Sequence, residues 1–149
     1  MYTKILMPTS GAPCSFRAAE YARDLLKINP SAQLTILYVR QRPQRTYRVY
    51  RWLEVEVPLS EEVKRQICEA EERILTQTAK IFTDAGIVTD TDVVHGTPAE
   101  EICAYAEKGG HDLIVMGSRI GGDTKGLFAR SISHHVVHTA KCAVLIVKG

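Results

Sequence analysis

The sequence predicts an α/β domain in which a parallel sheet of five strands is flanked by four main helices. Two observations lead to this fold class. Five short runs rich in valine, isoleucine and leucine are nearly continuous in apolar character, as strands are when helices cover both faces of a sheet. Segments with the 3.6-residue period of amphipathic helices separate these runs. Strands and helices that alternate in this way form parallel sheets with right-handed crossovers.

Length and composition indicate a single domain. The 149 residues are 45% hydrophobic and 24% charged, which is ordinary for a globular protein. The formal net charge of +2 is too small to suggest a nucleic-acid partner. No apolar run reaches about 18 residues, and the N-terminal MYTKILMPTS lacks the apolar core of a signal peptide. We therefore expect one domain over residues 1–149, in the cytoplasm and without a membrane partner.

The first two strands are predicted over 4–8 and 33–39, where the apolar runs are continuous. Between them, 15–27 carries alanine and leucine at helical spacing, and an Asn-Pro pair ends this helix. The longest helix is predicted over 60–85. Its apolar residues step by three and four, and Gly86 follows as a helix stop.

The third strand is predicted over 87–94, and the helix after it has the clearest end signals. Thr97 is a suitable N-cap, Pro98 suits the first helical position, and Glu100 completes a capping box. A Gly-Gly pair ends this helix. The sequence further predicts a strand over 112–117, a helix over 131–139 and a last strand over 143–148.

Two loops follow strand ends where a ligand would bind. In doubly wound sheets the ligand lies outside the carboxyl ends of the strands, near the point where the strand order reverses. The stretch 116–133 holds four glycines, and such a loop before a helix lets backbone N–H groups approach an anion. Ser131 and Ser133 supply hydroxyls, and Arg119 or Lys125 supplies charge. The alternative is turn geometry with helix capping by Ser131.

The segment 40–58 is predicted to be irregular. It carries five arginines interleaved with two tyrosines and Trp52. Arginine and aromatic side chains together grip anions, stack on bases or form a surface for a protein partner. The alternative is a solvated loop whose aromatic rings pack against the long helix. The segment is long for a connection, and long loops are often lids or partner surfaces.

Cysteine and histidine spacing indicates neither a disulfide framework nor a metal site. The four cysteines are scattered and are expected to be reduced thiols: Cys14, Cys68, Cys103 and Cys142. Cys14 is the one that lies in a candidate loop. His134 and His138 share a helical face, but no third ligand accompanies them, so we expect a solvent-facing pair.

Five motifs together resemble the universal stress protein family. They are KILMPTSGAPCSFRAAEYARDLL, TILYV, HGTPAEEI, DLIVMGSR and KGLFARSISHHVVHTAKCAVLIV, and they run in order along nearly the whole chain. The resemblance implies a doubly wound, Rossmann-like sandwich of the adenine nucleotide alpha hydrolase-like type. It also implies a homodimer formed through the last strand, with the interface residues Ala143, Val144, Leu145, Ile146 and Val147.

Nucleotide-binding members of that family carry a glycine, two residues, a second glycine, nine residues and then Gly-Ser or Gly-Thr. Here Gly117 matches the first glycine, but Ile120 and Arg130 occupy the positions of the other two. Ser10 stands where such members have aspartate after Pro-Thr. The resemblance implies a site for ATP or AMP made of Pro8, Thr9, Ser10, Val39, Gly117, Ser118, Arg119, Ile120, Arg130, Ser131, Ile132 and Ser133.

The three departures weaken the nucleotide motif physically. Ile120 is β-branched and poorly suited to a positive φ. Arg130 either fills the phosphate space or clamps an anion. Ser10 cannot accept hydrogen bonds as a carboxylate does. We therefore expect a dimeric stress-response binding or signalling module without turnover and with weak or no ATP binding. ATP or AMP binding through 117–133, and slow ATP hydrolysis there, are the alternatives.

Overall fold

A computed structural model describes residues 1–41, 46–50, 52–56, 60–118 and 127–148, with the backbone alone for 46–50, 53–56 and 127–131. One parallel sheet has the strand order β5-β2-β1-β6-β7. Its strands are β1 (Lys4–Pro8), β2 (Gln33–Arg40), β5 (Asp90–His95), β6 (Leu113–Ser118) and β7 (Ala143–Lys148). The predicted five-stranded parallel sheet with four helices is confirmed.

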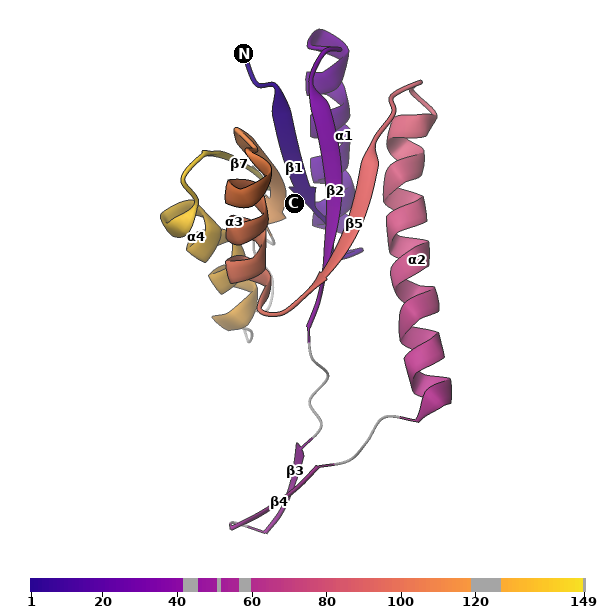
Figure 1. Cartoon of the computed structure of the whole chain (residues 1–149), viewed down its shortest axis with the longest axis vertical. Helices are drawn as coiled ribbons and strands as arrows, with labels where there is room; N and C mark the ends of the chain where they lie inside the picture. The colour runs from indigo at the N-terminus through magenta and orange to yellow at the C-terminus, as the bar shows by residue number, and fades with distance from the viewer. Residues whose placement is uncertain (42–45, 51, 57–59, 119–126, 149) are drawn as a thin grey trace.

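Two pairs of helices cover the two faces of the sheet (Figure 1). They are α1 (Pro13–Ile28) and α2 (Glu61–Thr83) on one face, and α3 (Pro98–Gly109) and α4 (Leu127–Thr139) on the other. Because side chains alternate along a strand, β1 feeds both cores. Met7 packs with Phe82 of α2 in the first core, and Leu6 packs with Val136 of α4 in the second.

β1 and β6 separate toward their carboxyl ends. They are paired only at Ile5 with Leu113 and at Leu6 with Ile114. The ladder of β1 with β2 continues to Pro8, and β6 remains paired with β7 along its whole length. The helix after β1 covers one face and the helix after β6 covers the other. The sheet therefore opens at the point where the strand order reverses, as doubly wound folds do.

Several helix ends differ from the predictions. Ser60 caps α2 by accepting a hydrogen bond from the Val63 N–H at 3.2 Å. Thr97 makes no such bond to α3, so the predicted capping box with Glu100 is wrong. The chain instead enters α3 through Gly96, whose φ is 146°. α4 begins at Leu127, four residues before the predicted start at residue 131.

The early start of α4 changes the interpretation of its serines. Ser131 lies inside the helix, so the predicted role as its N-cap is wrong. The physical reason is visible in the sequence, where Phe128, Ile132 and Val136 continue one apolar stripe at a spacing of four.

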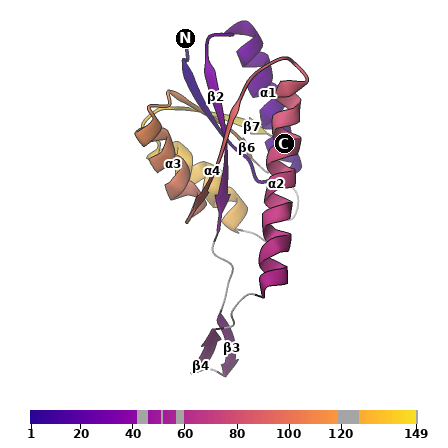
Figure 2. The same cartoon turned by 45° about the vertical axis from the view of Figure 1, so that its right-hand side comes forward.

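The segment predicted to be irregular contains an antiparallel pair of strands, β3 (Thr46–Tyr50) and β4 (Leu53–Glu56). Figures 1 and 2 show this hairpin projecting beyond the end of β2, away from the sheet. Trp52, between the two strands, is 81% exposed. Across the described ranges, no helix is long and apolar enough to cross a membrane.

Candidate functional site

A pocket of about 440 Å³ lies at the carboxyl ends of β1, β2 and β6, where the sheet opens. This volume falls within the range of small-molecule sites. Its described lining residues are Pro8, Thr9, Ser10, Cys14, Ser15, Leu37, Val39, Gln41, Pro98, Ile102, Met116, Gly117, Ile132 and Ser133.

Seven of the twelve residues implied by the family resemblance line this pocket: Pro8, Thr9, Ser10, Val39, Gly117, Ile132 and Ser133. Ser118 ends β6 nearby and is not among the lining residues. Arg119 and Ile120 lie outside the described residues. Arg130 and Ser131 belong to α4, where only their backbone is described.

One wall of the pocket is apolar. Val39 and Leu37 of β2, with Met116 of β6, belong to the core beneath α3 and α4, and Ile102 and Ile132 come from those helices. The motif did not include Leu37, Ile102 or Met116. Leu37 could have been found from the period of two along β2, because it lies on the same side as Val39. No motif in the sequence around Ile102 indicates that it lines the pocket, because only the packing of α3 brings it there.

At the pocket, the end of β2 extends beyond the last β1 residue paired with it. Thr9 N–H donates to the Leu37 carbonyl at 2.9 Å, so Leu37 directs its peptide groups toward β1. Arg40 directs its carbonyl toward β5, where Gly96 N–H donates to it at 3.1 Å. N–H and C=O groups alternate sides along a strand, so those of Val39 point toward the β1 side. Because Pro8 is the last β1 residue paired with β2, they point past the end of β1.

The first loop engages its hydroxyls internally. Ser10 N–H donates to Ser15 Oγ at 3.2 Å, and the two serine hydroxyls are 3.1 Å apart. Thr9 Oγ1 lies 3.3 Å from Thr78 Oγ1 of α2, which itself donates to the Ile74 carbonyl at 2.7 Å. The Thr9 hydroxyl is therefore directed at α2. Ser10, at the position of the family's aspartate, stabilises the turn that leads into α1.

Gly117 is required by packing. A Cβ at this position would lie 2.3 Å from the carbonyl oxygen of Cys14, in the first turn of α1. That distance is far inside van der Waals contact, and the obstacle is backbone rather than a mobile side chain. Gly117 thus lets the end of β6 touch α1 and form the floor of the pocket.

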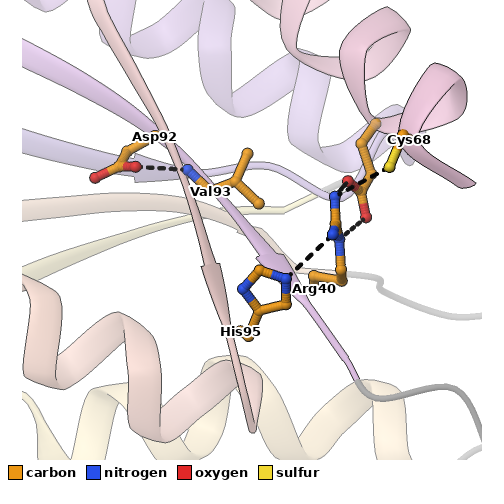
Figure 3. Close-up of polar contacts among 6 residues, drawn as sticks. Arg40, Cys68, Asp92, Val93 and His95 are labelled. Atoms are coloured by element: carbon orange, nitrogen blue, oxygen red, sulfur yellow. Dashed lines mark hydrogen bonds and ion pairs between the residues drawn. The ribbon is translucent and has the colours of Figure 1, made fainter.

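A polar cluster flanks the pocket at the end of β2 (Figure 3). Arg40 Nε donates to Glu71 Oε1 at 2.6 Å, and Arg40 Nη2 pairs with Glu71 Oε2. Arg40 Nη1 lies 3.1 Å from His95 Nε2, and Arg40 Nη2 lies 3.7 Å from Cys68 Sγ. The hydrogen bond that Arg40 donates to Glu71 raises the pKa of Arg40. Burial, followed by the Glu71 charge, raises the pKa of Tyr38.

The remaining candidate side chains lie apart from the pocket, except for Cys14. All four cysteines are free thiols, and burial raises the pKa of Cys103 and of Cys142. The ring centroids of His134 and His138 are 4.4 Å apart, on an exposed face of α4. No group of three histidine, cysteine, aspartate or glutamate side chains in the described part of the chain could hold a metal ion.

Fold and pocket together define a doubly wound α/β protein with a small-molecule pocket at its switch point. The chain belongs to the universal stress protein family, whose model matches residues 1–148. It is 30% identical to universal stress protein YxiE of Bacillus subtilis, over 99% of this chain and 100% of that protein. The structure of MJ0577 from Methanocaldococcus jannaschii is 25% identical and has a TM-score of 0.75, covering 100% of this chain and 97% of that one.

Two more distant structures share the fold and carry ligands. A universal stress protein in complex with cAMP is 21% identical with a TM-score of 0.70, over 98% of this chain and 97% of that one. A family protein from Arabidopsis thaliana with AMP bound is 17% identical with a TM-score of 0.61, over 98% of this chain and 91% of that one.

Proposed function

We propose that this chain binds an adenine nucleotide in the pocket and acts as a binding or signalling module of the stress response rather than as an enzyme. One observation carries the proposal. The N–H and C=O of Val39 point past the end of β1 into a pocket with an apolar wall. The AMP and cAMP complexes of the structural neighbours support the same ligand class.

Adenine suits this edge chemically. Its N1 accepts a hydrogen bond and its N6 amino group donates one, which complements the N–H and C=O of one extended residue. In the same orientation guanine presents a donor at N1 and an acceptor at O6, the reverse arrangement. Leu37, Met116 and Ile132 offer an apolar surface for a purine ring. We therefore expect AMP to bind more tightly than GMP, by about tenfold or more, since a mismatched buried hydrogen bond is costly.

The phosphate end of the site is less well matched to ATP. Ser133 places a hydroxyl-bearing residue at the pocket. Ser10 is engaged with Ser15 and offers no carboxylate for a ribose or a cation. The roles of Arg119, Ile120, Arg130 and Ser131 at the phosphates stay proposals. We expect AMP and cAMP to bind at least as tightly as ATP.

Calorimetry with AMP, cAMP, ATP and GMP tests the proposal. Ile132→Trp should fill the pocket and abolish AMP binding. Val137→Trp is the matched control, because Val137 lies on the same helix and is 50% exposed. Absence of AMP binding by the natural chain at millimolar ligand would contradict the proposal. Phosphate release from ATP by the natural chain, but not by Ile132→Trp, would favour slow hydrolysis instead.

We further propose that the module is a homodimer formed through β7. β7 is an edge strand, paired with β6 on one side, and edge strands are natural pairing sites. Ala143 is exposed, and Val144, Leu145 and Ile146 are half-buried. The side chain of Val147 is buried within the chain, so only its backbone is available for pairing.

The projecting hairpin is proposed as the surface for a protein partner, because β3 and β4 extend away from the sheet (Figure 2). Replacing 42–57 with a glycine-serine linker should leave AMP binding unchanged and abolish capture of such a partner. The cytoplasmic location and the lack of a nucleic-acid partner stay predictions from the sequence.

A further inference from the structure

We propose that Arg40 is a positioning residue for the pocket, acting through Glu71. This inference rests on the proposed nucleotide function. Arg40 lies between two pocket residues, Val39 and Gln41, but its own side chain points to the opposite face of the sheet. It therefore cannot touch a ligand beside Val39, and any effect that it has on binding is indirect.

The side chain of Arg40 is fixed by a carboxylate that cannot turn away. The side chain of Glu71 is 5% exposed, on the inner face of α2, whereas that of Arg40 is 30% exposed. The guanidinium meets both carboxylate oxygens through Nε and Nη2. Such a two-point contact sets the orientation of the guanidinium plane as well as its position. The end of β2 is thereby attached to the middle of α2.

Arg40 also holds the end of β5. Its Nη1 lies 3.1 Å from His95 Nε2, and its carbonyl accepts from Gly96 N–H at 3.1 Å. Figure 3 shows Arg40 between His95 and Cys68. Two residues after Gly96 comes Pro98, which lines the pocket. One side chain therefore joins β2, β5 and α2 at a point that borders two parts of the pocket wall.

The position of the Val39 backbone, which we propose to bind adenine, depends on the contacts that Arg40 makes with Glu71 and His95. Beyond Pro8, β2 has no β1 ladder to hold it. The pairing with β5, the packing of the Val39 side chain beneath α3 and α4, and the contact of Arg40 with Glu71 support this end of β2. Loss of the two-point contact should let the strand end shift, and small displacements of binding groups cost affinity.

The test compares AMP affinity with folding stability in three variants. Arg40→Lys keeps the positive charge but loses the fork, and Glu71→Gln keeps the shape but loses the charge. Each should weaken AMP binding about tenfold. Phe82→Leu is the control, because Phe82 is fully buried on the same helix and is not among the lining residues. It should lower stability while AMP affinity stays within about twofold.

Two further measurements separate positioning from a merely structural role. The double variant Arg40→Lys/Glu71→Gln should bind AMP no more weakly than either single variant, since both act on one contact. In the ligand-free protein, the amide resonances of Val39 and Gln41 should shift in Arg40→Lys and not in Phe82→Leu.

The results separate the positioning role of Arg40 from the proposed binding of AMP. If the natural chain binds no AMP, the proposed function fails, and the Val39 and Gln41 resonances alone decide the inference. If the natural chain binds AMP and both single variants bind within twofold of it, the inference is overturned and the function stands. Unchanged Val39 and Gln41 resonances in Arg40→Lys also overturn it.

Discussion

Gly117 stands where β6 touches the first turn of α1, and no side chain fits there. The family motif assigns this glycine to a phosphate loop, but the Cys14 carbonyl gives it a structural role as well. We predict that Gly117→Ala lowers the free energy of unfolding by ~1–3 kcal/mol, because backbone must move to accommodate the methyl group. Urea denaturation measures this. Ser118→Ala is the control, and equal stability of the two variants would contradict the packing account.

The burial of His111 leads to a prediction about how the stability of the chain depends on pH. It is 7% exposed, and neither ring nitrogen has a hydrogen-bond partner in the described part of the chain. Burial lowers the pKa of His111, and the nearby charge of Lys4 lowers it further, although the backbone of Ala106, the charge of Asp112 and the backbone of Tyr105 act in the opposite direction. The ring of Tyr105 also lies against it. The folded chain thus favours neutral His111.

The sign of the pH effect follows from proton counting. Below the pKa of about 6.5 of an unfolded histidine, the unfolded chain binds a proton that the folded chain resists, so stability falls as the pH falls. We predict that the natural chain loses stability between pH 7.5 and 5, and that His111→Leu loses less. Urea denaturation at both pH values checks this. Parallel losses in the two proteins would assign the effect to other groups.

At the scale of elements, the ends of helices provide a direct comparison of sequence and structure. Both Ser60 and Thr97 precede helices, but only Ser60 accepts a hydrogen bond from its helix. We predict that Ser60→Ala costs about 1 kcal/mol of unfolding free energy, the usual value of an N-cap. Thr97→Ala should cost less than ~0.5 kcal/mol. A larger loss for Thr97→Ala, measured by thermal or urea denaturation, would restore the predicted capping box.

The sheet could be predicted because each strand can be recognised from the apolar residues within its own segment. Buried strands such as β2 are mostly apolar runs, and a doubly wound fold follows from the alternation of such runs with helices. The start of α4 was placed too late, because the glycine-rich stretch before Leu127 resembles a long loop and obscures the apolar spacing that begins at Phe128. β3 and β4 were missed for a related reason, since Arg48 interrupts the short strand pattern in 46–50.

The candidate site divides in the same way. Val39 and Ser133 could be placed from motif positions, and both line the pocket. Ile102 and Met116 could not, because their place at the pocket arises from packing between elements far apart in sequence. Ile120 and Arg130, which replace two glycines of the family's nucleotide motif, predicted a weakened phosphate site. These two residues give no information about the Val39 backbone at the end of β2.

At the scale of the whole molecule, the account predicts a dimer held by β7. Ala143→Glu should shift the chain toward monomer, because Ala143 is exposed at the edge strand and a charge there costs little within one chain. Sedimentation velocity measures the shift. Lys141→Glu, at an exposed position just before β7, controls for added negative charge. An unchanged sedimentation coefficient for Ala143→Glu would place the interface elsewhere.

The central claim is that an adenine nucleotide binds against the backbone N–H and C=O of Val39, at the end of β2. Titration of the ¹⁵N-labelled chain with AMP tests it most directly. We predict that the amide resonances of Val39 and Ser133 shift together with one dissociation constant, while that of His111, which precedes the amino end of β6, does not move. If Val39 and Ser133 stay unchanged at millimolar AMP, or if His111 shifts equally, the pocket is not a nucleotide site.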